Sequence, residues 1–421
     1  MKKSLLVILI LLSVFSMSYA QGMDLTLDDV LVIALRDNPD ILLGIEDVKK
    51  AQAKVREAKA SLLPSVNFSG TWSDTRGLYS KDIPQNATQT TLKQYLFKGG
   101  RILNSIAESK YNLDSSEAAL DVARLEVGLS AEKAFYTLLL AKELVSLNRI
   151  IVDNTQEHLN YIKERYNSGE ASESDMLNLE SSLDSVKQAY EETISQFEAA
   201  DILLKDILNI DRDTNINPVG EFSYSPQELA YDEAFVKAMK DRPEIREYEA
   251  KVKANEKSVA IAKGESLPTV YASWDYYTKS TSSLSFSPTK GWQDYNIIGL
   301  TLSWPVFDGW ATKAKVQQAL ADLKTARIEK SRMISDIISE VRTSYLSLKD
   351  SMLQIKTSES QLAVFKDNLS TAQDKFEQGI VSSLDLDDAK LKHDISMFNK
   401  KQSVYDYFMA KSSFEKATGG I

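Results

Sequence analysis

Two stretches of the chain carry apolar residues at every seventh position. One row runs through Ile334, Val341, Leu348, Ile355, Leu362, Leu369 and Phe376. The corresponding row earlier in the chain runs through Leu138, Val145, Val152, Leu159 and Tyr166. A sustained seven-residue repeat is typical of helices that pack in a left-handed coiled-coil geometry. Both stretches therefore predict long helices with a buried seam.

The prolines limit how far these helices extend. All nine prolines lie outside residues 100–168 and 310–378, and a proline inside a helix costs about 3 kcal/mol. Each stretch predicts one helix, about 100 Å long at 1.5 Å per residue. Gly169 and Gly379 follow directly and suit C-terminal caps. Shorter helices are expected over residues 40–63, 172–209 and 382–417.

The chain repeats itself. Residues 25–41 align with residues 229–245 at an offset of 204, and Gly169 aligns with Gly379 at an offset of 210. Internal repeats of this kind indicate that one structural unit is built more than once. We predict a first repeat over 21–210, a joining loop over 211–228 and a second repeat over 229–421.

Strict alternation of apolar and polar residues interrupts the helical pattern once in each repeat. Val66, Phe68 and Trp72 fall on one face of the first segment. In the second, one face carries Ile298, Leu300, Leu302, Trp304 and Val306. The pattern predicts two strand pairs, within about 65–97 (65–79 with 88–97, around a polar loop containing Pro84) and about 269–306 (269–280 with 294–306).

These strands are long enough to cross a bilayer obliquely, which takes about 9–11 residues. An apolar face opposite a polar face is typical of a membrane barrel with a wet lumen. The same alternation also occurs in a half-buried sheet of a soluble protein. Four strands leave open edges, which lipid does not tolerate. If the strands lie in a membrane, several chains must pool them.

Composition narrows the function classes. Lys2, Lys3 and the apolar run over 5–15 predict a secretory signal peptide over residues 1–20. The chain has no cysteine and only two histidines, His158 and His393, which we expect on solvated helix faces. We therefore expect no disulfide, no metal site and no cofactor. The net charge of −10 argues against a nucleic-acid partner.

Taken together, these features resemble the TolC-type outer-membrane efflux proteins. The resemblance covers essentially the whole mature chain and rests on the order and spacing of several motifs. These are the duplicated NPD and RPE helix starts, the LPSV and LPTV strand starts, FDGW at 307–310, and RYNSGEASESD and KFEQGIVSSLDLDDA at the hairpin tips.

The resemblance implies a mainly helical fold with a β-barrel part, assembled as a homotrimer. Three chains would close one twelve-stranded outer-membrane barrel and a helical tunnel through the periplasm. The implied function is passive export, in partnership with an inner-membrane pump and a periplasmic adaptor. No enzymatic activity is implied.

The resemblance also implies a narrow periplasmic entrance at the hairpin tips. Asp385 and Asp388 match acidic positions of the constriction, and Asp175 matches a linking acid beside Ser174. Phe376 and Val381 stand where the family can carry a tyrosine and an arginine, so neither the hydroxyl nor the positive charge of the usual latch is present in this chain. Further positions are Asp387, whose spacing suggests a different face, and Gly169 and Gly379, expected to contact the adaptor. Capping of a helix start is the alternative role for these acids.

Two other function classes remain open at this point. A soluble periplasmic coiled-coil scaffold or adaptor would share the helices, although no compact module rich in short strands is evident. An enzyme is less compatible, because the chain has no GxSxG, GxGxxG, Walker or HExxH motif.

Overall fold

The structure is a computed structural model that describes residues 23–78, 81–222, 224, 230–280 and 292–420. The predicted signal peptide lies outside these residues. The chain divides into two compact units. Unit 1 comprises 1–43, 121–242 and 336–421, and unit 2 comprises 44–120 and 243–335. Each unit combines segments from both halves of the sequence.

The helices agree closely with the expected pattern. They are α2 (Leu27–Asp37), α3 (Pro39–Ala60), α4 (Arg101–Asn167), α5 (Glu173–Leu208), α6 (Tyr231–Asp241), α7 (Pro243–Gly264), α8 (Ala311–Glu377) and α9 (Ser383–Ala417). The two long helices, α4 and α8, have 67 residues each and confirm the long helices predicted from the proline-free stretches. Among the described residues, no helix is both long and apolar enough to cross a membrane.

Proline also divides the start of each half into two helices. Asn38 and Arg242 precede Pro39 and Pro243 and are extended, with ψ angles of 133° and 120°. A residue before proline disfavours the helical region, so α2 and α6 end there. α3 ends at Ala60 rather than at the expected residue 63. The chain after it forms tighter turns ahead of Pro64, closed by i→i+3 bonds such as the one from Leu63 N to Ala60 O.

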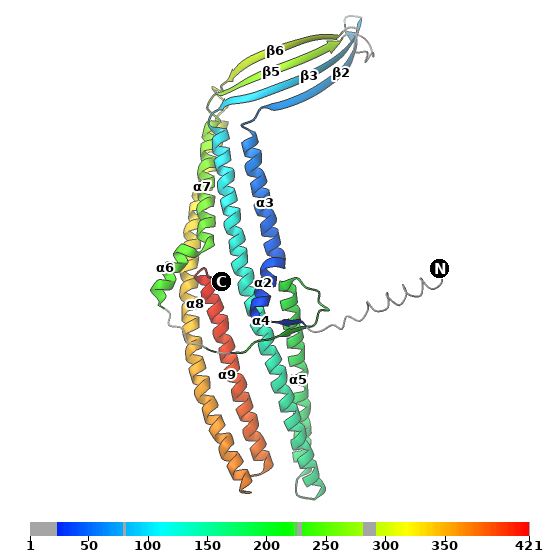
Figure 1. Ribbon diagram of the computed structural model, residues 1–421, viewed down its shortest axis with the longest axis vertical. Coiled ribbons are helices and arrows are strands. Elements are labelled where there is room, and N and C mark those ends of the chain that lie inside the picture. Colours follow the sequence, from blue (N-terminus) through cyan, green and yellow to red (C-terminus); the bar gives the residue numbers. More distant parts are fainter. Residues whose placement is uncertain (1–22, 79–80, 223, 225–229, 281–291, 421) are drawn as a thin grey trace, which may run out of the picture. The chain divides into compact units, whose positions relative to one another are not determined.

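The strands of unit 2 form one antiparallel sheet in the order β2–β3–β5–β6 (Figure 1). They are β2 (Ser65–Leu78), β3 (Lys81–Lys98), β5 (Thr269–Ser280) and β6 (Trp292–Ser303). The predicted pairs β2–β3 and β5–β6 are present. A third pairing, β3–β5, joins them into a single sheet.

Two predicted strand limits were wrong. β3 begins at Lys81 and includes Pro84, which was expected in a loop. Pro84 pairs with Asp74 of β2, and the last residue of β5, Ser280, lies opposite Asn86 of β3. Among the described residues, Pro84 therefore has a neighbouring strand on one side only, and a missing N–H is tolerated on the other side. At the other end, β6 stops at Ser303, opposite the first residue of β5, and Trp304 and Val306 lie beyond it.

The sheet has one apolar and one polar face. A single register row crosses the apolar face through Val66, Leu92, Trp274 and Ile298. The next row, on the opposite face, includes Thr91 and Asp275, and Thr91 Oγ1 donates to Asp275 Oδ1 at 2.6 Å. The predicted alternation is present in β2 and in the second half of β6, whereas residues 88–94 of β3 are polar on both faces apart from Leu92.

Unit 1 contains the buried part of the heptad seams. Leu138, Val341, Leu348 and Ile355 are all almost completely buried. Toward the tip of α8 the row is less covered, and Phe376 is 42% exposed. A short parallel pair, β1 (Met23–Leu25) with β4 (Ile216–Pro218), holds part of the segment that was expected to be only a joining loop.

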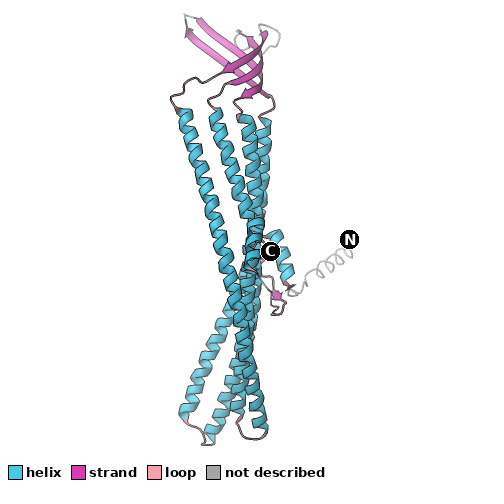
Figure 2. Ribbon diagram, turned by 90° about the vertical axis from the view of Figure 1, so that its left-hand side faces the viewer, coloured by secondary structure: helices cyan, strands magenta, loops and turns pink. Residues whose placement is uncertain are grey.

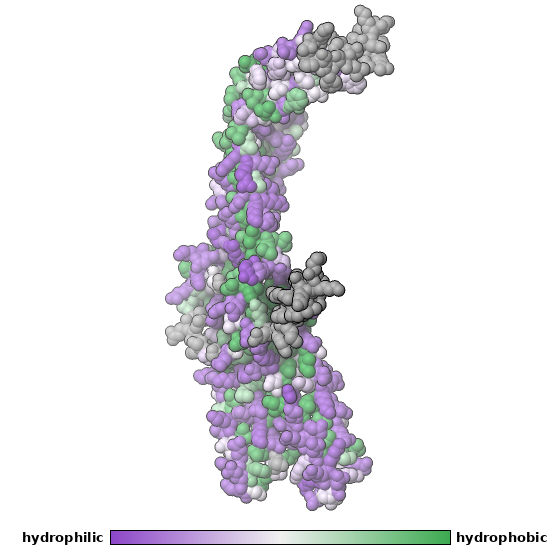
Figure 3. Space-filling view, turned by 45° about the vertical axis from the view of Figure 1, so that its right-hand side comes forward, coloured by the Kyte–Doolittle hydropathy of each residue, from purple (hydrophilic) through white to green (hydrophobic). Residues whose placement is uncertain are grey.

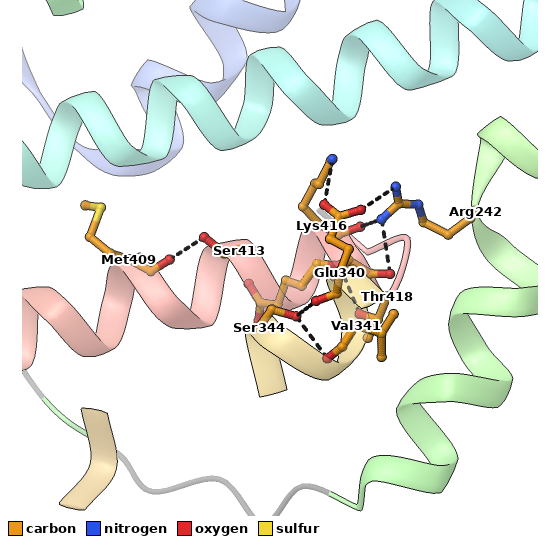
Figure 4. Close-up of polar contacts among 10 residues, drawn as sticks. Arg242, Glu340, Val341, Ser344, Met409, Ser413, Lys416 and Thr418 are labelled. Carbon is orange, nitrogen blue, oxygen red and sulfur yellow. Dashed lines mark hydrogen bonds and ion pairs between the residues drawn. The ribbon is translucent and has the colours of Figure 1, made fainter. Parts of the chain in front are cut away.

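Two matching junctions fasten the returning helices of unit 1. Asn38 Nδ2 donates to the carbonyl oxygen of Ile207 at 2.8 Å. The guanidinium of Arg242 donates to the carbonyl oxygen of Ala417 at 3.2 Å, the residue that matches Ile207 at the offset of 210. Figure 4 shows that Arg242 also meets Glu340 of α8, at 2.9 Å, and Lys416 Nζ lies 2.8 Å from the same carboxylate. The Arg242 side chain is only 3% exposed.

Candidate functional site

The candidate site lies at the tips of the two helical hairpins of unit 1, α4–α5 and α8–α9 (Figures 1 and 2). Both tips use the same turn. Gly169 and Gly379 have φ angles of 80° and 71°, a region that favours glycine. Gly169 N donates to Tyr166 O and Glu170 N donates to Arg165 O, which is the Schellman pattern. The second tip repeats both bonds.

The glycines are required by backbone conformation, not by crowding. A β-carbon added at Gly169 or Gly379 would meet no heavy atom within 4 Å. Both residues are exposed, so each tip presents an open, small-residue turn.

Each returning helix begins with a capping box. Ser172 Oγ accepts from Asp175 N at 3.2 Å, and Asp175 Oδ2 accepts from Ser172 N at 3.3 Å. Ser382 and Asp385 make the same pair of bonds, at 3.2 and 3.0 Å. In both boxes the serine hydroxyl also donates to the carboxylate at 2.7 Å. The capping role that the sequence left open is therefore present for Asp175 and Asp385.

These hydrogen bonds keep both carboxylates ionised. The bond from the Ser172 hydroxyl, helped by the Ser172 backbone N–H, lowers the pKa of Asp175 below its usual value. Ser382 lowers the pKa of Asp385 in the same way. Capping therefore does not remove the negative charge, because each tip still presents a fixed carboxylate to solvent.

The remaining predicted positions lie on two different faces. Asp388 and Ser174 are exposed, Phe376 is 42% exposed and Val381 is half-buried. Asp387 points elsewhere, as its spacing suggested. Its Oδ2 lies 3.9 Å from Nε2 of His158 on α4, and its Oδ1 accepts from Lys390 Nζ at 3.1 Å.

The expectation that His158 lies on a solvated face was wrong. Its side chain is only 16% exposed, and its Nε2 is buried without a hydrogen-bond partner among the described residues. The 3.9 Å separation from Asp387 is too long for a hydrogen bond. His158 thus sits where the α4–α5 hairpin meets the α8–α9 hairpin. The available signal was its position next to Leu159, a seam residue.

Both tips are acidic. Residues 163–175 and residues 375–390 each contain four acidic and two basic side chains, a net charge of −2. Within each tip some charges are paired, such as Lys163 with Glu180 at 2.9 Å. No group of three or more metal-binding side chains occurs in the part of the chain that the structure describes.

Comparison with known proteins places this geometry in context. A family model described as outer membrane efflux protein matches residues 30–209 and 235–415. Alkaline protease secretion protein AprF of Pseudomonas aeruginosa is 23% identical over 405 residues, which cover 90% of this chain and 81% of that protein. Outer membrane efflux protein BepC of Brucella suis is 22% identical over 379 residues, covering 88% and 78%.

A solved structure agrees with these matches. The CmeC outer membrane channel of Campylobacter jejuni superposes with a TM-score of 0.83 at 18% identity, over 94% of this chain and 85% of that one. The predicted resemblance, fold class, export function and outer-membrane location are confirmed at the level of the family, whose members are channel proteins. The chain belongs to the outer membrane efflux protein family.

Proposed function

We propose that three copies of this chain form one exit duct, which crosses the outer membrane and continues into the periplasm. The observation that carries the proposal is the four-stranded sheet of unit 2, whose outer strands β2 and β6 each have one neighbour in the chain. Its apolar face includes Phe68, Ile298 and Leu300, which are 73%, 80% and 70% exposed. Such a face and two open edges require lipid and further strands.

The width of the barrel sets a lower limit on the number of copies. Two chains would supply about eight strands, and the interior of such a barrel is filled by side chains. A duct needs a wider barrel, and three chains, the number that the resemblance implies, supply about twelve. The polar row through Thr91 and Asp275 then faces the lumen.

We further propose that the hairpin tips form the periplasmic entrance. Asp385 and Asp388 would form acidic rings around the three-fold axis, with Asp175 and Ser174 beside them. Phe376 and Val381 cannot supply a hydroxyl or a charge, so other side chains would link the hairpins. The contact between His158 and Asp387 supports the proposal that these two residues form such a link.

The partners are part of the same proposal. An inner-membrane pump would supply the energy, and a periplasmic adaptor would dock on the open turns at Gly169 and Gly379. The relatives include a protease secretion protein and an efflux protein. Export of either type of substrate is consistent with a passive duct. The division into repeats over 21–210 and 229–421 is also proposed, because both halves place the same elements in the same order.

The test of the entrance is ion selectivity in a planar bilayer. Replacing Asp385 and Asp388 by Asn should reduce the preference for cations and weaken block by multivalent cations, because a ring of carboxylates attracts cations. Asp322→Asn with Asp367→Asn removes the same charge from exposed positions of α8 and should leave selectivity unchanged. Ser382→Ala breaks a capping box without changing charge. If the Asp385 and Asp388 variant kept the selectivity of the original chain, the acidic entrance would be excluded.

A further inference from the structure

Trp310 has a backbone conformation that its side chain disfavours. Gly309 and Trp310 connect the sheet to α8 with φ angles of 66° and 69°. The matching residues before α4, Gly99 and Gly100, have φ angles of 58° and 71°. The two junctions share one backbone shape, and only the second places a bulky residue where glycine is favoured. A strained residue of this kind indicates a functional role for its side chain.

The ring of Trp310 lines an open groove at this junction, with a volume of about 370 Å³. The apolar wall consists of Val306, Phe307 and Trp310, which are 81%, 75% and 67% exposed. Phe307 and Trp310 meet edge to face with ring centroids 6.1 Å apart. These three side chains form a large exposed apolar patch, and such a patch usually marks a site that binds a partner or a membrane.

Two lysines give the other wall a positive charge. Lys263 and Lys313 line the groove, and neither has an ion-pair partner among the described residues. Lys313 Nζ lies 5.2 Å from the centre of the Trp310 ring. Asp308 also lines the groove, caps the start of α8 and stays ionised, so the three charged side chains of the lining carry a net charge of +1. Its carboxylate accepts from Thr312 N at 2.8 Å and from the Thr312 hydroxyl, which lowers its pKa.

The groove lies where the apolar face of the sheet ends. Val306 follows β6 by three residues, and Trp304 Nε1 donates to the carbonyl oxygen of Ser266, which also lines the groove. Figure 3 shows hydrophobic residues gathered where the strands of unit 2 join its helices. Aromatic rings beside lysines are typical of the level of lipid headgroups.

We infer that this groove binds the headgroup of an anionic phospholipid in the periplasmic leaflet of the outer membrane. The phosphate lies between the ammonium groups of Lys263 and Lys313, and the acyl chains lie along Val306 and Phe307. The ring of Trp310 separates the two regions and supports Lys313. This inference rests on the proposed placement of the sheet in the membrane.

The test is native mass spectrometry of the full-length protein, delipidated in detergent and titrated with phosphatidylglycerol. Lys263→Gln with Lys313→Gln should weaken binding about 30-fold, since each lysine near an anionic surface contributes about 1 kcal/mol and 1.4 kcal/mol is tenfold. Trp310→Gly should weaken binding about two- to fivefold through the lost cation–π contact. It should leave the thermal midpoint unchanged or raised, because glycine relieves the strained conformation.

The matched control is Lys59→Gln with Lys315→Gln. Lys59 matches Lys263 in the first half of the chain, and Lys315 is paired with Glu265 at 2.7 Å. This control removes the same charge and should bind phosphatidylglycerol like the original chain. Equal lipid affinity in the Lys263 and Lys313 variant and in the control would overturn the inference. So would loss of the oligomer in that variant, which would mean that another copy occupies the groove. In either case, conduction by the original chain would still support the proposed duct.

Discussion

Arg242 and Asn38 occupy matching positions and fasten matching helix ends with different chemistry. Asn38 uses a neutral amide, whereas Arg242 brings a buried guanidinium to Glu340 and to the end of α9. Burial opposes the charge of Glu340, but the hydrogen bond from Lys416 and the charge of Arg242 outweigh it and lower its pKa. The stability of this junction therefore depends on a few individual side chains.

Removal of Arg242 should be costly. Arg242→Ala should lower the free energy of unfolding by about 2–3 kcal/mol, less than for a fully buried pair because Glu340 is partly exposed and keeps Lys416. The change is measured by urea denaturation of the whole chain in detergent, with the loss of helix monitored by circular dichroism. Arg36→Ala removes an exposed arginine paired with Asp37 and should cost below about 1 kcal/mol. Equal losses in the two variants would contradict the account.

Replacement of Glu132 should raise the stability of the chain, whereas replacement of Arg242 should lower it. Burial on α4 raises the pKa of Glu132, although Ser412 donates a hydrogen bond to it. A raised pKa means that the folded state holds the proton more tightly. The associated stability is present below the unfolded pKa of about 4.3 and is lost as the pH rises through the folded value. Glu132→Gln, which cannot ionise, should therefore be more stable than the original chain at pH 7.

The stability difference should disappear near pH 4, where both side chains are neutral. Thermal midpoints at several pH values provide the measurement. Glu126→Gln is the control, since Glu126 is exposed on the same helix. A Glu132→Gln variant that melts below the original chain at pH 7 would show that the carboxylate is stabilising.

At the scale of the elements, hydrogen bonds hold the turn of each hairpin, and weaker contacts join the two hairpins near their tips. Each tip has its own glycine turn and capping box. Between α4 and α9, the contacts near the tip include the 3.9 Å approach of His158 to Asp387. Farther along these helices, Lys401 pairs with Glu143 at 2.7 Å. Among the described residues, separation of the hairpins near their tips therefore breaks few strong interactions, whereas farther along the helices the stacked rings of Tyr136 and Phe408, with centroids 4.5 Å apart, also join them.

The contact of His158 with Asp387 predicts that this pair helps to hold the two hairpins together. His158→Gln removes the imidazole ring that lies 3.9 Å from the Asp387 carboxylate, and it should raise the single-channel open probability in a planar bilayer. His393→Gln makes the same change on α9 and is the control. An unchanged open probability in His158→Gln would exclude the link.

Much of this level of structure could be predicted from the sequence. Proline positions and the seven-residue rows placed the ends of α4 and α8 to within one residue. These ends could be predicted because prolines and helical periodicity act on the local backbone. The start of β3 was missed, because a proline usually interrupts a strand, whereas here Pro84 pairs with Asp74 of β2 and lies beyond the last described pair of β3 with β5. The β1–β4 pair joins segments far apart in the chain, for which the local pattern carries no signal. The burial of His158 had one local signal, its position next to the seam residue Leu159. The two capping boxes were visible in the sequence as SESD and SSLD. The sequence did not show whether a capping role excludes a role of these aspartates at the entrance.

For the molecule as a whole, two features require further copies of the chain. Unit 2 supplies a sheet with an apolar face and open edges, and unit 1 supplies acidic hairpin tips on long helices. Neither is complete in one chain, because the edges need partners and the tips need a symmetry axis. Assembly of several copies satisfies both requirements. The central claim is therefore that the functional unit is a membrane-embedded trimer.

The most direct measurement is the mass of the complex extracted from outer membranes with mild detergent, determined by native mass spectrometry. The account predicts a complex of three mature chains, recovered from the membrane fraction and stable without added partners. Recovery of the chain as a monomer from the soluble periplasmic fraction would contradict it.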